Sequence, residues 1–415
     1  MTKLASWIQT KLHELNVTDT MDVPEGFTRL SFSKEEAEAH NHFQKVAKEL
    51  GLFTYQDGVG NQWAVWEVDK EVPTIAIGSH LDTDPCGGGY DGVAGVLCAL
   101  GAIKNLKDSQ YQPAKNIAVI CFVSEESARF GISTIGSKAI TGMLNKAEMS
   151  FVTDIDGVTI KEAMEEYGLI WEEIDQPELP VDKLESFVEL HIEQGMQIEK
   201  NNADIGVVNG VSCPVRLKIS VYGMANHTGT TPMNQRRDAF VAITPLVNFI
   251  SDEAIKINKS SSHSLVATVS TINLKPNSMN VIPGEVELGV DIRSVDDEIK
   301  RRFADTIREY CNCIEDKNDV SIEIKTLVDN DSVILDIDVQ QKLIQASNEN
   351  GYYTYTMDSG AGHDVMNMAK KWPSGLIFIP CKDGISHQPG EFTSIRNLEK
   401  GINTLTKYLQ INAEK

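Results

Sequence analysis

The sequence predicts an α/β protein in which a larger domain with a mostly parallel sheet carries an inserted ferredoxin-like βαββαβ domain. Three observations predict this fold. Apolar strands alternate with helices toward both ends of the chain, strictly alternating strands fill its middle, and 415 residues exceed one ordinary core. We expect the larger domain to comprise residues 1–212 and 329–415, and the smaller one residues 213–328.

The first part of the chain alternates between helix and strand signals. MTKLASWIQTKLHELNV is an amphipathic helix, and Ser33 with Glu36 predicts a capping box for a helix that runs to Leu50. The next elements are a hairpin, LFTYQDGVGNQWAVWEV, the strand VPTIAIG, the helix GVAGVLCALGAIKNL, the strand NIAVICFV, a helix near SKAITGML and the strand SFVELHI. Apolar strands between helices are typical of a parallel sheet that is covered on both faces.

The pattern changes near Cys213. VRLKISVYG alternates strictly, and we expect TTPMNQRRDAFVAITPLVNFI to be helical directly after Pro232. The strands HSLVATVSTINL and GEVELGVDIR, the helix SVDDEIKRRFADTIREYCNCI and the strand DVSIEIKTLV complete a βαββαβ unit. The earlier pattern then returns with the helix VQQKLIQASNENG, the strands YYTYTM and GLIFIP, and the helix SIRNLEKGINTLTKYLQI.

Composition and charge exclude several classes of protein. A formal net charge of −22 argues against nucleic acid as a partner, because phosphate binding needs a basic face. No apolar run approaches the ~20 residues of a membrane span, and the N-terminus lacks the apolar core of a signal peptide. The seven scattered cysteines contain no CxxC pair and indicate free thiols, so we expect a cytoplasmic protein without membrane contact.

Histidine and acidic residues follow the ends of four predicted strands. They are His80, Asp82 and Asp91 after VPTIAIG, Glu125 and Glu126 after NIAVICFV, His191 in SFVELHI, and His387 after GLIFIP. Open α/β sheets bind ligands outside the carboxyl ends of their strands. We therefore expect these side chains to meet at one edge of the sheet.

Three imidazoles and several carboxylates predict a site for two divalent metal ions, with one carboxylate bridging them. Zinc is the first expectation, and manganese, cobalt or nickel suit the same ligands. Glu125 and Glu126 are adjacent and point different ways, so one can bind metal while the other accepts a proton from water. Asp82 is placed to fix the second ring nitrogen of His80.

Several motifs together carry a resemblance to a known family. In chain order they are GSHLDTDPCGGGYDG, SEESARFG, ELHIEQG, GMANHTGTTPMNQRRDA, NVIPGEVELGVDIR, GAGHD and DGISHQPGEFT. From Gly78 to Thr393 the sequence resembles the hydantoinase/carbamoylase family of dinuclear-metal amidohydrolases. The resemblance implies a metallopeptidase-like catalytic domain and a lid domain that also forms a homodimer.

The resemblance also assigns roles to individual residues. The residues that match metal ligands, with Asp91 as the bridge, are His80, Asp91, Glu126, His191 and His387. Glu125 matches the general base, and Asp82 matches the residue that supports His80. The residues that match substrate-binding positions are His227, Asn280 and Arg293 in the lid, and Gln194, Arg216 and His363 nearby.

Two lid residues have distinct implied roles. His227 matches a residue that stabilises charge on the tetrahedral oxygen, and Arg293 can grip a substrate carboxylate. Without the resemblance, Arg293 would be interpreted as a surface residue paired with Asp291. Members of the family often bring lid residues into the site from the partner subunit, and we expect the lid to open and close.

The sequence therefore predicts a homodimeric two-metal amidohydrolase that acts on a small ureido or carbamoyl carboxylate. The first expectation is an N-carbamoyl-L-amino acid, and allantoate is the close alternative. A dipeptidase or aminoacylase is disfavoured by Asp91-Gly92-Val93 and by His191, where that branch often has a carboxylate. A non-catalytic binder is disfavoured because every expected ligand and the base are present. Cys86, where the family often has Asn, is interpreted as a passive thiol beside the metals, with an extra metal ligand or an oxidation-prone thiol as the alternatives.

Overall fold

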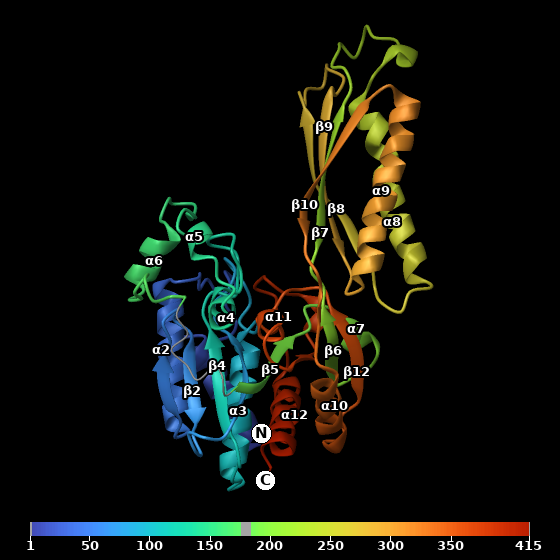
Figure 1. Cartoon of the computed structure of the whole chain (residues 1–415). Coiled ribbons are helices and arrows are strands. Elements are labelled where there is room, and N and C mark those ends of the chain that lie inside the picture. The colour runs from blue at the N-terminus through green and yellow to red at the C-terminus, as the bar shows by residue number, and fades with distance from the viewer. Residues whose placement is uncertain (1, 176–183, 415) are drawn as a thin grey trace. The chain divides into compact units, whose positions relative to one another are not determined.

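The computed structural model describes residues 2–175 and 184–414 of the chain (Figure 1). The chain divides into two compact units. Unit 1 comprises Met1–Asn209, Leu335–Met357 and His363–Lys415, and unit 2 comprises Gly210–Ile334 and Asp358–Gly362. Within the described ranges, no helix combines the length and the apolar character that a membrane crossing needs.

The larger sheet has the strand order β1-β2-β4-β3-β5-β13-β6-β11, with β12 paired to β6. Its strands are β1 Phe53–Gln56, β2 Gln62–Trp66, β3 Thr74–His80, β4 Asn116–Phe122, β5 Leu184–Ile192, β6 Ile205–Val211, β11 Val333–Ile334, β12 Thr354–Ser359 and β13 Ser374–Ile379. The central strands β4, β3, β5 and β13 are parallel, and β2 and β6 flank them in antiparallel pairing. The predicted α/β class with a parallel sheet centre is confirmed.

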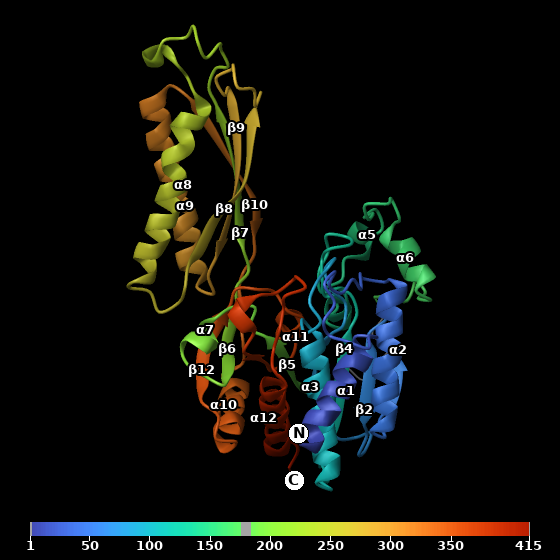
Figure 2. The ribbon, with the colours of Figure 1, turned by 180° about the vertical axis from the view of Figure 1, so that it is seen from behind.

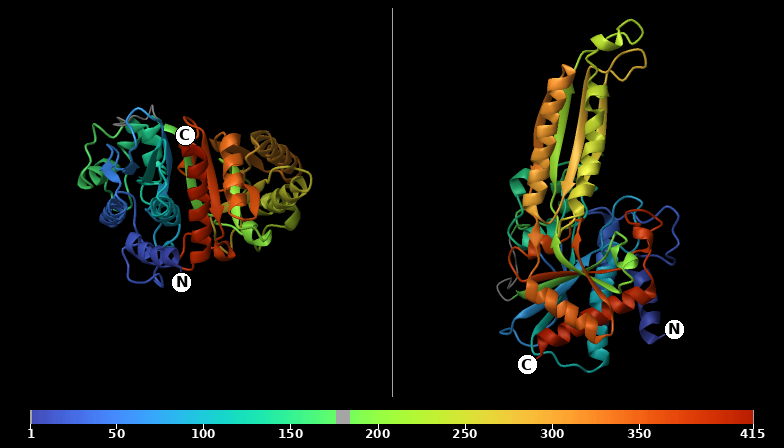
Figure 3. Two further views of the ribbon diagram at one scale, coloured as in Figure 1. Left: turned by 90° about the horizontal axis from the view of Figure 1, so that it is seen from below. Right: turned by 90° about the vertical axis from the view of Figure 1, so that its right-hand side faces the viewer.

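Helices cover the sheet of unit 1. The long ones are α1 Lys3–Leu15, α2 Lys34–Glu49, α3 Val93–Asp108, α10 Ile337–Glu349 and α12 Ile395–Ala413. Their apolar side chains join those of the central strands in one buried cluster, and α12 lies beside α10 (Figure 3). The short helices are α4 Ile135–Ile140, α5 Lys146–Met149, α6 Ile160–Glu166, α7 Gln197–Lys200, α11 Val365–Met368 and the 3-10 turn η3 Lys382–Gly384. A separate buried cluster lies under α4, α5 and α6.

The start of α2 departs from the prediction. Ser33 caps the helix by accepting the Glu36 N–H at 3.1 Å. The Glu36 carboxylate does not reach back to Ser33, so the predicted reciprocal half of the capping box is wrong. It accepts instead from the N–H groups of Phe32, at 2.5 Å, and Ser124, at 2.9 Å. Glu36 is fully buried, and it therefore ties α2 to the turn that follows β4.

Unit 2 is a four-stranded antiparallel sheet with two helices on one face (Figure 2). Its elements are β7 Val215–Tyr222, α8 Ala239–Asn258, β8 Val266–Lys275, β9 Glu285–Arg293, α9 Asp297–Asn318 and β10 Ser321–Asp329. The strand order β10-β7-β9-β8 and the βαββαβ sequence of elements are those of the predicted ferredoxin-like unit. Alternate residues of β7 and β9 pack against α8 and α9 to form its core.

The helix α8 begins later than predicted. Pro232 precedes only a 3-10 turn, η2 Met233–Gln235. The helix starts at Ala239, because the Asp238 carboxylate accepts the N–H groups of Phe240 and Val241 and so caps it there. The expectation of a helix directly after Pro232 is therefore wrong.

Candidate metal centre

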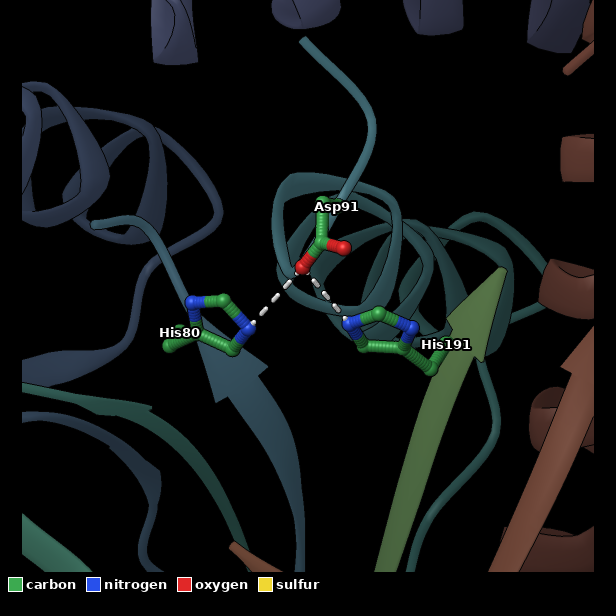
Figure 4. Close-up of side chains that lie close together, drawn as sticks. All are labelled: His80, Asp91 and His191. Carbon is green, nitrogen blue, oxygen red and sulfur yellow. Dashed lines mark hydrogen bonds and ion pairs between the residues drawn. The ribbon is translucent and has the colours of Figure 1, made fainter. Parts of the chain in front are cut away.

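The Asp91 carboxylate lies between three imidazole rings, two of which are drawn in Figure 4. Its Oδ1 is 3.3 Å from Nε2 of His80 and 3.0 Å from Nε2 of His191. Its Oδ2 is 3.3 Å from Nε2 of His387. His80 ends β3, His191 lies near the end of β5, and Asp91 lies two residues before α3. The carboxyl ends of neighbouring parallel strands thus bring these side chains together, as the strand-end pattern predicted.

The approach of α3 to this cluster depends on glycine. Gly92 has φ of 62°, and a Cβ atom there would lie 2.5 Å from the His80 ring. Gly95 lies one turn further along, where a Cβ atom would lie 2.1 Å from the Leu190 carbonyl oxygen. Only glycine allows the helix to bring Asp91 this close to the strand ends.

The orientation of each buried imidazole is fixed at its second nitrogen. Nδ1 of His80 is 3.2 Å from Oδ1 of Asp82 and 3.1 Å from the Asp82 carbonyl oxygen. Nδ1 of His191 is 2.9 Å from the Ile192 carbonyl oxygen. Nε2 of both rings therefore faces Asp91, which is the arrangement of metal-binding histidines.

Asp82 also holds the segment that follows β4. Its carboxylate accepts the N–H of Glu125 at 3.0 Å and that of Glu126 at 2.9 Å. Ser124, just before them, has a positive φ of 54°, which turns the chain sharply at this point. One buried carboxylate thus positions both glutamates and the His80 ring.

A second group of potential ligands adjoins the first. Nε2 of His387 is 3.6 Å from Oε1 of Glu126, and Nδ1 of His387 is 2.5 Å from Oδ2 of Asp84. In the described chain, the possible metal-binding groups are His80 with Asp91 and His191, and Asp84 with Glu126 and His387. Cys86 is exposed and belongs to neither group. The structure therefore brings the five predicted ligands together and adds Asp84, while their role as ligands stays a prediction.

The charges of the cluster depend on one another. Burial alone would raise the pKa of Asp91, but the rings of His191, His387 and His80 hold it well below its usual range. Asp84 and Asp91 raise the pKa of His387 to about 11. Burial and the nearby Asp91 raise the pKa of Glu126 to about 8, and burial raises the pKa of Glu125 well above its usual range. Divalent cations between these groups would favour the ionised carboxylates.

Two further side chains contact the cluster. The Gln194 amide nitrogen lies 2.7 Å from Oδ2 of Asp91 and 2.9 Å from Nε2 of His387. The His363 ring is buried, with its centroid 4.6 Å from that of His191. Burial, reinforced by His191, lowers the pKa of His363 well below its usual range, so this ring is neutral. Gln194 and His363, both predicted near the substrate, therefore lie against the cluster.

Sequence reasoning missed Glu391. Its Oε1 accepts the N–H groups of Tyr90 and Asp91 at 2.9 and 2.8 Å. Its Oε2 accepts from Ser386 Oγ at 2.9 Å and from the His387 N–H at 3.2 Å. One buried carboxylate thus joins two loops that are about 300 residues apart. Its position four residues after His387 is the only signal in the sequence.

The predicted substrate residues of unit 2 form two separate pairs. Nε of Arg216 and Nε of Arg293 each lie 2.8 Å from the Asp291 carboxylate, and Nη1 of Arg293 donates to the Gly360 carbonyl oxygen at 2.6 Å. The pairing of Arg293 with Asp291 is the one that the sequence alone suggested. His227 and Asn280 form the other pair, in which the Thr228 N–H donates to the Asn280 carbonyl oxygen at 3.1 Å.

The two pairs lie at opposite ends of the four-stranded sheet. Arg216 is opposite Asp291 near the start of β7, and Tyr222 is opposite Glu285 at the end of β7. His227 follows the end of β7, and Asn280 precedes β9. At ~3.3 Å per residue the strand alone separates the pairs by about 20 Å. Within unit 2 of a single chain, a small molecule at Arg293 does not reach His227.

Residues 76–411 match the profile of Peptidase family M20/M25/M40. A ureidoglycolate hydrolase from Arabidopsis thaliana is 34% identical over 97% of this chain and 85% of its own length. An N-carbamoyl-L-amino acid amidohydrolase from Geobacillus stearothermophilus is 32% identical, and an allantoate amidohydrolase from Escherichia coli strain K12 is 34% identical, each over 92% of both chains.

A solved structure supports the fold. The crystal structure of an amidase of the hydantoinase/carbamoylase family from Burkholderia multivorans is similar, with a TM-score of 0.89 and 28% identity. The similarity covers 99% of this chain and 98% of that one. Both units of the chain therefore have counterparts in a single solved protein.

Proposed function

The chain belongs to peptidase family M20/M25/M40 and is an amidohydrolase of its carbamoylase and allantoate amidohydrolase group, and from this premise we propose that it hydrolyses N-carbamoyl-L-amino acids. The products are the amino acid, ammonia and carbon dioxide. The observation that carries the proposal is the placement of the Asp91 carboxylate between the rings of His80, His191 and His387. These side chains come from separate segments of the chain and are mostly buried.

The donor set fits a pair of divalent ions. Imidazole nitrogens and carboxylate oxygens suit zinc first, and also manganese, cobalt or nickel. We assign His80 and His191 to one ion, Glu126 and His387 to the other, and Asp91 to both. When bound, such ions polarise a carbonyl group and promote the ionisation of water.

Glu125 is the proposed general base. The residue is only 8% exposed and lies beside Glu126, and burial raises the pKa of its carboxyl group. A carboxylate in this setting can take a proton from the attacking water and return it to the departing nitrogen. Asp82 and the Thr134 N–H, which donates to the Glu125 carbonyl oxygen at 2.8 Å, hold its backbone in place for this task.

Arg293 and Arg216 are the proposed anchor for the substrate carboxylate. Two guanidinium groups share the single carboxylate of Asp291, so this trio has a net positive charge. Guanidinium groups bind carboxylates through paired hydrogen bonds. Nη1 of Arg293 donates to the Gly360 carbonyl oxygen and Nη2 lies 3.4 Å from Oδ2 of Asp291. Each of these nitrogens carries two N–H groups, so each keeps one for a ligand. An N-carbamoyl amino acid and allantoate each carry a carboxylate of this kind.

A homodimer would complete the site. His227 and Asn280 lie at the far end of the unit 2 sheet from Arg293, so one copy would supply the arginine and a second copy the other pair. The edge strand β8 and the adjoining helix α8 expose apolar residues, including Val266 at 58%, Ile272 at 53% and Val241 at 64%. An open strand edge beside an apolar helix face suits pairing with a second copy about a two-fold axis.

The role of Glu125 is tested by the variant Glu125→Gln. We expect turnover of an N-carbamoyl amino acid to fall by about 10²–10⁴-fold, because an amide of the same shape cannot accept the proton. Metal content measured by elemental analysis should stay normal, since Glu125 is not one of the proposed ligands. Turnover close to that of the unchanged protein would show that another group is the base.

The substrate is tested by a side-by-side assay. N-carbamoyl-L-amino acids, allantoate, ureidoglycolate and dipeptides should be compared by kcat/KM on the same metal-loaded preparation. We expect the N-carbamoyl amino acids to be turned over best. A higher kcat/KM for allantoate or ureidoglycolate would keep the two-metal amidohydrolase and change its substrate, and a preference for dipeptides would overturn the assignment.

We also propose a cytoplasmic location. Cys86 and Cys313 are exposed and form no disulfide bond. Exposed free thiols persist in reducing compartments. Fractionation of cells that express the full chain would test this, because recovery outside the cytoplasmic fraction would contradict it.

A further inference from the structure

The environment of His387 differs from that of the other two cluster histidines. His80 and His191 are each 1% exposed, whereas the His387 side chain is 40% exposed. His80 and His191 belong to strands, whereas His387 lies in a loop with a positive φ of 57°. A half-exposed imidazole in a strained loop needs other contacts to hold one orientation.

The structure supplies such contacts on both the backbone and the ring of His387. The Glu391 carboxylate accepts its N–H at 3.2 Å. On the ring, Nδ1 is 2.5 Å from Oδ2 of Asp84, while Nε2 faces Oδ2 of Asp91 at 3.3 Å and Oε1 of Glu126 at 3.6 Å. The two nitrogens of the ring thus face two different sets of carboxylates.

Asp84 could bind an ion itself or could hold the His387 ring, and the geometry distinguishes these two roles. Asp84, Glu126 and His387 lie close enough together to share an ion. However, the two nitrogens of an imidazole point in divergent directions, so an ion on Nε2 lies away from the Asp84 carboxylate at Nδ1. Asp84 is therefore placed to accept the Nδ1–H of a ring whose Nε2 binds metal, as the carbonyl oxygen of Ile192 is placed at His191.

We propose that Asp84 is a positioning residue for His387, which fixes the tautomer and the orientation of this ring so that Nε2 faces Asp91 and Glu126 and can bind the second metal ion. The inference rests on the proposed two-metal function. It gives each histidine of the cluster its own partner at Nδ1: Asp82 for His80, a main-chain carbonyl for His191, and Asp84 for His387. The role of Asp84 matters most because His387 is the least buried of the three.

The loop that carries Asp84 is held by its backbone and does not need the Asp84 side chain. The N–H of Gly87 donates to the Phe27 carbonyl oxygen at 2.8 Å, and that of Cys86 donates to Thr28 Oγ1 at 2.9 Å. The Thr83 N–H donates to the Arg29 carbonyl oxygen at 2.8 Å. Variants at Asp84 are therefore expected to fold, and their effects should be confined to His387.

The test measures metal binding directly. Zn²⁺ is titrated into metal-free full-length protein in a calorimeter, in the presence of a competing chelator. Three proteins are compared: the unchanged sequence, Asp84→Asn and Asp84→Leu. In Asp84→Leu we expect the dissociation constant of one ion, the one that His387 would hold, to rise about 10–100-fold and that of the other ion to stay unchanged. Asp84→Asn should show a smaller rise, because its amide oxygen still accepts from Nδ1–H.

The control and the contrary outcomes separate this inference from the proposed function. Asp108→Asn, at the exposed end of α3, removes an equal charge far from the cluster and should leave both dissociation constants unchanged. If the unchanged protein binds two ions and Asp84→Leu binds them equally well, the role of Asp84 is wrong and the two-metal function stands. Loss of both ions in Asp84→Leu would also overturn the inference. An unchanged protein that binds fewer than two ions would overturn the proposed function itself.

Discussion

The cluster around Asp91 in unit 1 and the cluster around Asp291 in unit 2 each surround a carboxylate with groups that can carry positive charge, but these groups differ in kind. Asp91 is buried, and its neighbours are imidazoles and further carboxylates. Asp291 is partly exposed, and its neighbours are the guanidinium groups of Arg216 and Arg293. The first carboxylate is paired with groups that can lose their charge, and the second with groups that cannot.

The difference indicates what each region lacks. Around Asp91 the buried carboxylates outnumber permanent cations, and burial raises the pKa of Glu125 and Glu126, so the region is short of positive charge. Around Asp291 two guanidinium groups face one carboxylate, so the region is short of negative charge. The first is suited to metal cations and the second to the carboxylate of a substrate.

The largest expected effect is the difference between removing the central carboxylate of the first region and removing that of the second. Asp91→Asn should lose bound metal and lower turnover by at least ~10³-fold, because the shared ligand of both ions is gone. Asp291→Asn should keep its metal content and lose much less activity. Elemental analysis and steady-state kinetics on both variants would check this. Equal metal content in the two variants would break the proposed contrast between the regions.

The strand-end pattern was sufficient to predict most of the cluster. His80, Asp82 and His191 follow from their positions at the ends of apolar strands, because parallel strands place their carboxyl ends at one edge. Asp84 and Glu391 could not be predicted in this way. Asp84 follows the strand like any solvated loop residue, and the contacts of Glu391 lie with residues about 300 positions away.

Prediction of the fold from the sequence was limited in the same way. Strands and helices with clear periodicity were predicted, while β6 was missed because IGVVNGV contains two glycines and no alternation. The start of α8 was placed too early, because the capping contact of Asp238 outweighs the helix signal of Pro232. The reciprocal contact of Glu36 was misassigned, because a buried partner on Ser124 competes with the local one. In the two helix cases a contact between side chain and backbone decided the outcome, and periodicity does not report such contacts.

A complementation experiment would sharpen the comparison between the two ends of unit 2. His227→Ala and Arg293→Ala should each lower kcat/KM by about 100-fold or more, because each removes a charged or polar contact to the substrate. If His227 acts from the second copy, refolding the two variants together in equal amounts should restore activity. Half of the dimers would be mixed and each would have one intact site, so about a quarter of the original activity should return.

The same experiment has a clear contrary outcome. If both residues served the site of their own chain, every site in the mixture would contain one damaged residue, and no activity would return. Refolding each variant alone is the matched control for losses during handling. Sedimentation should show that the variants and their mixture have the same oligomeric state, because neither residue belongs to β8 or α8.

The smallest expected effect concerns a buried histidine that lies outside the cluster and is not a proposed metal ligand. His40 on α2 is 2% exposed, and the Tyr167 hydroxyl lies 2.7 Å from its Nδ1. Burial, together with the nearby Arg29, lowers the pKa of His40 to about 4 against the opposing charge of Asp82. His40 therefore stays neutral in the folded protein at neutral pH, whereas Asp82 and Asp91 raise the pKa of His80 well above its usual range.

The sign of the resulting pH dependence follows from linkage. In the unfolded chain a histidine ionises near pH 6.5, whereas His40 in the folded protein ionises near pH 4. Between these two pH values the unfolded state binds a proton that the folded state does not bind. The stabilisation from neutral His40 is present above pH 6.5 and is lost as the pH falls, by about 2 kcal/mol between pH 7 and pH 5. Urea unfolding of His40→Gln should show a pH dependence weaker by this amount, while His13→Gln, on α1, should match the unchanged protein. An identical pH dependence in His40→Gln would mean that the pKa of this imidazole does not change on folding, which would contradict the prediction.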